Sequence, residues 1–298
     1  MPAFNRKYGQ KGGFSFRLGR KGQSKGKPDR KQVFSIQKSK RYLSLNRLIG
    51  KGRSRKTQET EILRQWIAEA RNIVFFGGAG VSTASGIPDF RSAHQGIYNT
   101  PGGRSYEEML SHEYFVTHPD EFWDFYRRVM LYPDAKPNAA HLALAELERR
   151  GKCKAVVTQN IDGLHQAAGS EKVLELHGSV HRNRCMKCGR FYPLEPLLQG
   201  EGAPHCSCGG VIKPEVVLYG EPLDDMVMEE ALSAIARCDL LIVGGTSLVV
   251  YPAAGLIRYR SPRCRLALLN RDATDYDRAA GLVVRDDLTQ VLWDAVGD

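Results

Sequence analysis

The chain has 298 residues, 42% of them hydrophobic and 26% charged, which is the composition of an ordinary globular protein with a sizeable core. No apolar run approaches the roughly 20 residues of a membrane-spanning helix, which excludes such a span, and seven cysteines, an odd count, argue against a disulfide framework. The net charge of +10 is uneven: residues 1–56 hold 18 Lys/Arg and one acid, Asp29, whereas the remaining 25 basic and 32 acidic residues make the rest mildly acidic.

Residues 1–56 are rich in Gly, Ser, Lys and Arg and are predicted to be disordered, because they cannot bury enough apolar surface to offset the entropy of ordering. Three interpretations are open: a solvated extension, for which an over-long start-codon assignment is one origin, an arm that touches nucleic acid or other anionic surfaces, and an organelle-targeting segment. The Gly and Lys content and the lack of an amphipathic period argue against targeting. No secretory signal is visible, so the default expectation is a cytoplasmic location.

Helices and strands are predicted to alternate from about Thr57 onward. A first amphipathic helix precedes a buried strand over 72–76, which runs into glycines. Further helices are expected over 139–150, over about 224–237, ahead of 265 and at the end of the chain, and further strands over 154–158, 239–244, 265–270 and 282–284. This alternation predicts an α/β fold whose parallel sheet is covered by helices on both faces.

The first motif follows the first strand and reads GAGVSTASG over residues 78–86, before Asp89, Phe90 and Arg91. Glycines after a strand let the backbone approach a pyrophosphate, and the amides of a helix start then hold its charge. A tight strand-to-helix turn and a surface salt bridge explain the same residues without a ligand.

Two further motifs place polar groups near predicted strand ends. In TQNIDGLH (158–165), Gln159, Asn160 and Asp162 can orient sugar hydroxyls or a carboxamide, although Asn and Asp before a helix are also ordinary caps. In LHGS (176–179), His177 has the ring pKa that suits a general base near neutral pH. Any single histidine is more often a surface or core residue, and only its neighbours favour this one.

Four cysteines form two close pairs, Cys185 with Cys188 and Cys206 with Cys208, separated by 17 residues. This spacing predicts a tetrahedral zinc site, and its closed four-thiolate shell makes the zinc structural; two redox pairs are the alternative. The other cysteines, Cys153, Cys238 and Cys264, are interpreted as small core residues.

The last motif is GGTSL (244–248), which follows a very apolar strand, with Asn270 at the end of the next strand. These groups suit contacts to phosphates and to a second ribose. Glycine-rich turns are common, so each is a weak signal alone.

Taken together, the five motifs resemble the sirtuin family of NAD-dependent protein lysine deacylases, in the expected order and over about residues 60–290. The resemblance implies a Rossmann-like catalytic domain over 57–298, in parts of about 57–180 and 213–298. It also implies a helical segment near 92–137 and a zinc module at about 181–212.

In such enzymes the acyl oxygen attacks the ribose carbon that bears nicotinamide, which gives nicotinamide and an alkylamidate. The resemblance then makes His177 the general base on a ribose hydroxyl and Asn160 a second catalytic residue, with free lysine and O-acyl-ADP-ribose as products. It implies the following NAD-binding residues: Gly78, Ala79, Gly80, Asp89, Phe90, Arg91, Gln159, Asn160, Asp162, Gly245, Thr246, Ser247 and Asn270. Acylated protein or peptide is expected to pair with the segment 216–221, where Val217, Tyr219 and Gly220 contact the substrate.

One departure bears on acyl specificity. Family members that prefer acidic acyl groups carry a Tyr and an Arg three residues apart, and here Val129 stands where that Arg would fall after Tyr126. A pocket without this cation is expected to prefer neutral groups such as acetyl. Arg127 or Arg128 could substitute only if the helix register is shifted by one residue.

Two alternatives to deacylation remain. One is mono-ADP-ribosyl transfer to an acceptor side chain, which has less use for His177. The other is a zinc-ribbon module that binds nucleic acid through the basic tail, which explains the tail and the cysteines but leaves the three polar loops and His177 without a purpose.

Overall fold

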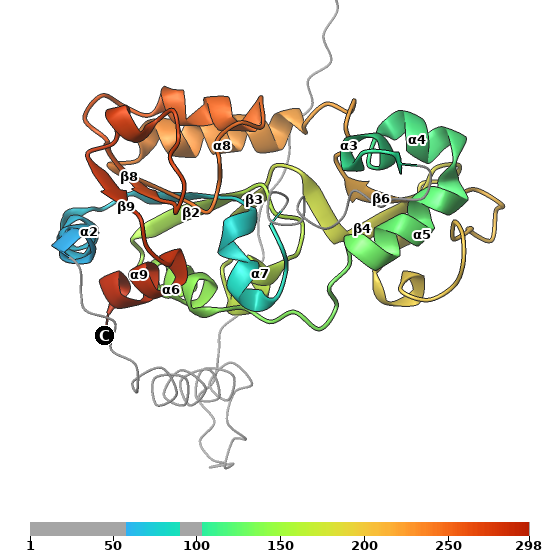
Figure 1. The fold of residues 1–298 in the computed structure, drawn as a ribbon, viewed down its shortest axis with the longest axis horizontal. Helices are drawn as coiled ribbons and strands as arrows, with labels where there is room; N and C mark the ends of the chain where they lie inside the picture. Colours follow the sequence, from blue (N-terminus) through green and yellow to red (C-terminus); the bar gives the residue numbers. More distant parts are fainter. Residues whose placement is uncertain (1–57, 90–102, 298) are drawn as a thin grey trace, which may run out of the picture. The chain divides into compact units, whose positions relative to one another are not determined.

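The computed structural model describes residues 58–89 and 103–297. Its frame is a six-stranded sheet in the order β3-β2-β1-β7-β8-β9, in which every neighbouring pair is parallel (Figure 1). The strands are β1 (Ile73–Gly77), β2 (Cys153–Thr158), β3 (Val173–Glu175), β7 (Leu240–Gly244), β8 (Arg265–Leu269) and β9 (Leu282–Val284).

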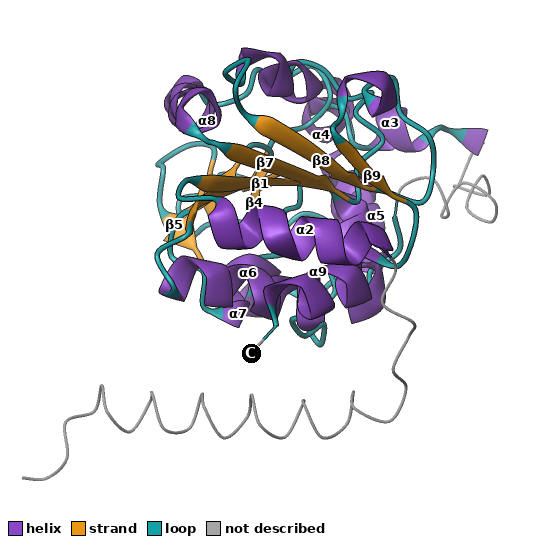
Figure 2. Cartoon of the chain, turned by 90° about the vertical axis from the view of Figure 1, so that its left-hand side faces the viewer, coloured by secondary structure: helices purple, strands orange, loops and turns teal. Residues whose placement is uncertain are grey.

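Helices cover both faces of this sheet. One face packs against α2 (Gln58–Glu69), α6 (Ala139–Arg149) and α9 (Leu288–Val296), and the other against α8 (Asp225–Arg237) and the 3-10 helix η6 (Ala253–Tyr259) (Figure 2). Successive strand side chains therefore enter different cores: in β1, Ile73 and Phe75 join the first core, and Val74 and Phe76 the second.

A smaller antiparallel sheet has the order β5-β4-β6 and consists of β4 (Gly178–Cys185), β5 (Phe191–Tyr192) and β6 (Ile212–Val216). It shares a third core with α3 (Tyr106–Met109), α4 (His112–Thr117) and α5 (Pro119–Val129). The indole Nε1 of buried Trp123 in α5 donates to the carbonyl oxygen of Ile212 at 2.9 Å, which ties the helices to this sheet.

Short helices complete the described chain: η1 (Ala79–Val81), η2 (Thr83–Ser85), α7 (Leu164–Ala168), η5 (Glu195–Leu197) and η7 (Asp277–Ala279). Side-chain caps fix where the longer helices begin. Asp224 accepts from two amides at the start of α8, Asp287 does so for α9, and Asn138 with His141 forms a capping box on α6.

The predicted fold class is confirmed: a parallel sheet with helices on both faces and a small cysteine-bearing module. The helix expected ahead of residue 265 is a 3-10 helix instead, and Gly255 inside it disfavours a regular α-helix. The domain boundaries stay predictions, and residues 1–56, Phe90 and Arg91 lie outside the described residues. Among the described helices, none has the length and apolar character needed to cross a membrane.

Candidate active site

The site lies where the chain direction across the sheet changes. From β1 the chain moves outward through β2 to β3, and it later returns beside β1 with β7 before moving the other way to β9. The loops that leave the carboxyl ends of β1 and β7 therefore diverge and open a crevice, the position at which open α/β sheets bind ligands. A cavity of about 860 Å³ occupies this position.

Two glycine loops meet at the base of the crevice, backbone against backbone. The amide of Gly80 donates to the carbonyl of Gly245 at 2.8 Å, and that of Gly78 to Gly244 at 3.2 Å. A Cβ on Gly80 would lie 2.7 Å from Cα of Gly245, and one on Gly245, whose φ is +62°, would lie 2.5 Å from the amide nitrogen of Val81. Glycine is required on both sides of this contact, and the cradle that results fits the diphosphate of NAD.

The polar loop after β2 crosses the same crevice. The side-chain amide of Gln159 donates to Oγ1 of Thr246 at 3.0 Å, which links this loop to the one after β7. The hydroxyl of buried Ser82 donates to Asp162 Oδ2 at 2.6 Å and accepts from Asn160 Nδ2 at 3.0 Å. One serine from the first motif thus fixes two polar side chains of the second.

His177 stands at the edge between the two sheets with a defined ring orientation. Its Nδ1 lies 2.9 Å from the carbonyl oxygen of Gln159. Since a carbonyl oxygen only accepts, Nδ1 carries the hydrogen and Nε2 of the neutral ring keeps its lone pair. Burial lowers the pKa of His177 below its ordinary value, although the Gln159 carbonyl acts in the opposite direction.

The segment after β6 connects His177 on one side with helices α3 and α4 on the other. The amide of Val217 donates to the carbonyl of His177 at 2.9 Å. Tyr219, which is half exposed, exchanges backbone hydrogen bonds with residues 110 and 112 on its far side. The carboxylate of Glu221 accepts from Leu218 N, Lys213 Nζ and His112 Nδ1, so the loop is fixed at its turn.

The predicted residues come together as one set. Among the residues that line the cavity are these predicted ones: Gly78, Ala79, Gly80, Asp89, Gln159, Asn160, Asp162, His177, Val217, Tyr219, Gly220, Gly245, Thr246, Ser247 and Asn270. This set includes every described residue that the sequence assigned to catalysis, cofactor or substrate; Phe90 and Arg91 are outside the described residues.

The wall beside helix α5 contains Tyr126 and Val129. Tyr126 is fully buried, and burial raises the pKa of its hydroxyl. Arg127 turns the other way: its guanidinium donates to the carbonyls of Leu197 and Gly202 at 2.9 and 2.7 Å. Arg128 is exposed, and neither arginine lines the cavity.

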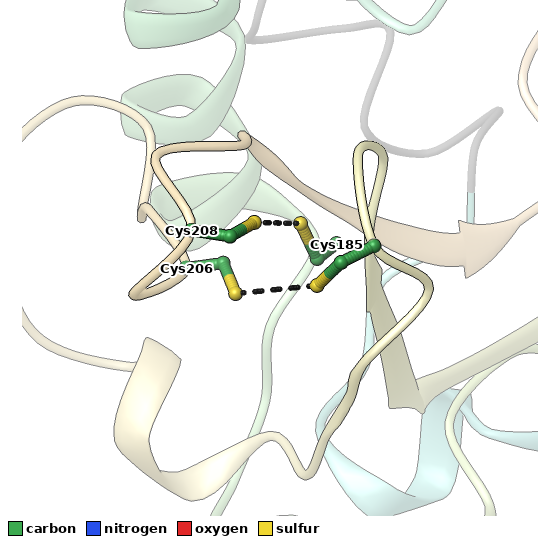
Figure 3. A group of neighbouring side chains, drawn as sticks. Cys185, Cys206 and Cys208 are labelled. Carbon is green, nitrogen blue, oxygen red and sulfur yellow. Dashed lines mark hydrogen bonds between the residues drawn. The ribbon is translucent and has the colours of Figure 1, made fainter.

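The four cysteines Cys185, Cys188, Cys206 and Cys208 form a separate cluster beside the small sheet. Their sulfur atoms all lie within 4.8 Å of one another, with contacts of 3.4 Å for Cys185–Cys208 and 3.6 Å for Cys188–Cys206 (Figure 3). Tetrahedral zinc with Zn–S bonds of about 2.3 Å separates its sulfurs by about 3.8 Å, so the cluster fits the ion. Gly210 leaves the space that this needs, because a Cβ there would lie 2.7 Å from Sγ of Cys185.

Some site residues were missed in the sequence. Ser82 lies within the first motif but carries no signal beyond a hydroxyl between glycines, and Glu221 binds His112, which lies 109 residues away in the chain. The stretch 286–289 and Arg271 also line the cavity, although the sequence marks them only as a helix start and a loop. A search for polar residues just after each predicted strand would have found Arg271.

This architecture defines a nucleotide-binding α/β protein with a catalytic cleft and a separate zinc module. The sequence model of the Sir2 family matches residues 78–252. An NAD-dependent protein deacetylase of Cutibacterium acnes is 57% identical over 234 residues, which cover 78% of this chain and 95% of that one.

Solved structures agree. A Sir2 homologue in complex with NAD has a TM-score of 0.73 and 37% identity, covering 79% of this chain and 92% of that one. A Sir2 structure with deacetylated p53 peptide and 3′-O-acetyl ADP ribose has a TM-score of 0.72 and 38% identity, covering 80% and 97%. The chain belongs to the Sir2 family, as its motifs predict.

Proposed function

We propose that this enzyme removes acetyl and other neutral acyl groups from protein lysines with NAD, which gives nicotinamide, O-acyl-ADP-ribose and free lysine. The observation that carries the proposal is the orientation of His177, whose Nε2 lone pair is available in the cavity that also holds the glycine cradle. The deacetylase activity named for the relatives, and the acetyl ADP ribose in one neighbouring structure, support it.

Different residues along the cavity contact different parts of NAD in this proposal. The glycine cradle formed by Gly80 and Gly245, with Thr246 and Ser247, holds the phosphates, and Asn270 lies at the adenosine end. When bound, NAD supplies a ribose carbon with nicotinamide as its leaving group.

At the reacting end, Asn160 and Asp162, aligned by Ser82, orient the nicotinamide ribose and the carboxamide. His177 takes up the proton of a ribose hydroxyl at Nε2. Asp89, Phe90 and Arg91 belong to the nicotinamide end in this proposal, the last two outside the described residues.

The substrate enters along Val217, Tyr219 and Gly220. The amide and the carbonyl of Tyr219 are already bonded to Leu110 and His112, so the acyl-lysine backbone must pair with other backbone groups of this segment. Main-chain pairing reads little sequence, and a range of acylated proteins fits this mode. The proposed preference for neutral acyl groups rests on two observations. Val129 lines the cavity, and the Arg127 guanidinium binds the Gly202 carbonyl instead of lining it.

The test is NAD turnover with an acetyl-lysine peptide, in which nicotinamide and O-acetyl-ADP-ribose are both measured. We expect equal amounts of the two products, and a loss of about 10²-fold or more in His177→Ala. The matched control is His118→Ala, an exposed histidine outside the cavity, which keeps full activity. Nicotinamide release with ADP-ribose attached to protein, and unchanged by His177→Ala, would identify mono-ADP-ribosyl transfer instead.

For residues 1–56 we propose weak, non-specific contacts with polyanions, supported by their 18 basic residues and single acid. Deleting residues 1–56 should abolish salt-sensitive DNA binding and leave NAD turnover unchanged. DNA binding that survives the deletion would place the contact on the catalytic domain. A cytoplasmic location is likewise a proposal from the sequence.

A further inference from the structure

Two cysteines outside the zinc cluster lie thiol to thiol. Cys238 is the C-cap residue of α8, two positions before β7, and Cys264 directly precedes β8. Because β7 and β8 are parallel neighbours, their amino ends lie side by side, and Sγ of Cys238 is 3.3 Å from Sγ of Cys264. A disulfide requires about 2 Å between sulfurs, so the two atoms need to approach by little more than about 1 Å.

The two thiols differ in their surroundings. Cys264 lines a cavity of about 500 Å³ together with Arg258, Arg260 and Arg265. The hydrogen bond with Cys238 lowers the pKa of the Cys264 thiol against the opposing effect of burial, and the positive charge of Arg260 acts in the same direction as the hydrogen bond. The same hydrogen bond and burial raise the pKa of Cys238. Cys264 is therefore the thiol that ionises first and that a small molecule in the cavity can reach.

We propose that Cys238 and Cys264 are a reversible oxidation site, which a peroxide converts into a disulfide. The Cys264 thiolate attacks one oxygen of hydrogen peroxide: an S–O bond forms, the O–O bond breaks, and hydroxide leaves and is protonated to water. Cys238 then attacks the sulfenic sulfur of Cys264, so that the S–S bond forms, the S–O bond breaks and a second water leaves with the thiol proton. The two thiols lose two electrons and one peroxide gains them.

The link would close a loop that contains all of β7, the Gly244–Ser247 turn and η6. This segment forms one side of the candidate active site, whereas the sulfurs lie at the opposite ends of the strands. The disulfide therefore ties the segment down without entering the cavity. A loop of this size predicts a rise in melting temperature on the order of 5–10 °C.

The first experiment treats the full-length zinc-loaded chain with hydrogen peroxide. The chain is then denatured in the presence of N-ethylmaleimide, which blocks the remaining free thiols, and digested with trypsin without reductant. Because Arg237 and Arg263 precede the two cysteines, the expected product is peptide 238–258 joined to the dipeptide 264–265, and dithiothreitol should separate them. Cys153 is the matched control: it is equally buried, burial raises the pKa of its thiol to about 12, and it should be recovered as the maleimide adduct.

Single variants test the order of the two steps. In Cys238→Ser the reaction should stop at Cys264 sulfenic acid, which a cyclic 1,3-diketone traps, and in Cys264→Ser no such adduct should form on Cys238. Full recovery of both cysteines as maleimide adducts, at a peroxide dose that already releases zinc, would overturn the proposal. Trapping on Cys238 alone would overturn the assignment of the nucleophile, and an unchanged or lower melting temperature of the linked form would overturn the stabilising role.

Discussion

His177 is held by a hydrogen bond from its Nδ1 to the carbonyl of Gln159, and this contact decides both its orientation and its tautomer. The same carbonyl belongs to the loop that bonds Thr246, so the ring is oriented by the element that closes the cradle. Because burial lowers the pKa of His177, the ring is neutral and basic at physiological pH.

The pH dependence of kcat/KM follows from this shift. Protonation of Nε2 removes the base, so activity should fall on the acid side with an apparent pKa below about 6.5, the ordinary histidine value. The measurement is kcat/KM for an acetyl-lysine peptide over a pH series, after zinc content is shown to be constant. An acid limb centred above neutral pH would contradict the assignment of His177.

Val129 is the second position at which one side chain should set a property of the enzyme. It lines the cavity one helical turn from Tyr126, whose buried hydroxyl has no hydrogen-bond partner within the described residues. A cation at position 129 would lie beside that hydroxyl and could bind a carboxylate on an acyl group.

Val129→Arg should therefore shift the preference from acetyl toward succinyl. We expect the ratio of kcat/KM for succinyl-lysine to that for acetyl-lysine to rise roughly 10- to 100-fold, the effect of a charge-assisted hydrogen bond. Val129→Leu is the matched control, since it keeps the wall apolar and should leave the ratio unchanged. No change in the arginine variant would remove Val129 as a determinant of specificity.

At the scale of elements, the loops after β1 and β7 behave as one structure. Their contact between Gly80 and Gly245 is so close that neither residue can carry a Cβ. The left-handed φ of Gly245 adds a conformational requirement to the steric one.

Gly245→Ala should separate these loops and raise the KM for NAD by roughly 10-fold or more, since a displaced cradle no longer matches the shape of the diphosphate. Gly151→Ala is the control: its φ of +71° is similarly strained, but a Cβ there meets nothing within 4 Å. That variant should lose about 1 kcal/mol of stability and keep the KM for NAD. Equal effects on KM in both variants would contradict a role for the close contact.

What the sequence could predict at this scale depended on local signals. Strands such as β1 and β7 are short apolar runs that end in glycine, and the residues after them could be assigned before any fold was known. Ser82 and Glu221 could not, because their roles come from partners that the chain brings close only on folding: Asp162 is 80 residues from Ser82. The 3-10 form of η6 was missed because helical periodicity alone does not weigh Gly255.

Across the whole molecule, two buried histidines couple stability to pH. The rings of His141 in α6 and His165 in α7 are 4.7 Å apart, and both are almost fully buried. Both nitrogens of His165 lack a hydrogen-bond partner in the part of the chain that the structure describes. Burial lowers the pKa of His141 to about 4 and that of His165 well below its ordinary value.

Both histidines have a native pKa below the unfolded value, so stability is unaffected above about pH 6.5, where both states are neutral. Below that pH the unfolded chain takes up protons that the native state refuses, and each histidine should cost about 1.4 kcal/mol per pH unit. In wild type the free energy of unfolding falls between about pH 6.5 and pH 5. In His165→Phe this fall should be smaller than in wild type by about 2 kcal/mol. Urea titrations measure this difference.

The exposed His118→Asn is the control for this experiment, and it should retain the wild-type pH slope. Because wild type and variants carry the same cysteine cluster, any acid-induced loss of zinc is common to them and cancels in the comparison. Identical slopes for wild type and His165→Phe would show that the buried histidine is already protonated in the native protein.

The contact between Gly80 and Gly245 joins parts of the chain that lie 165 positions apart, and the cradle has no counterpart in either part alone. A partly folded chain therefore lacks the NAD-binding cradle, and NAD can bind only after the complete sheet has formed. By mass action, free NAD at ten times its dissociation constant would add about 1.4 kcal/mol to the folding equilibrium. The amount of this enzyme that survives proteolysis in a cell should then follow the NAD supply, so that a fall in NAD would reduce the number of enzyme molecules as well as their rate.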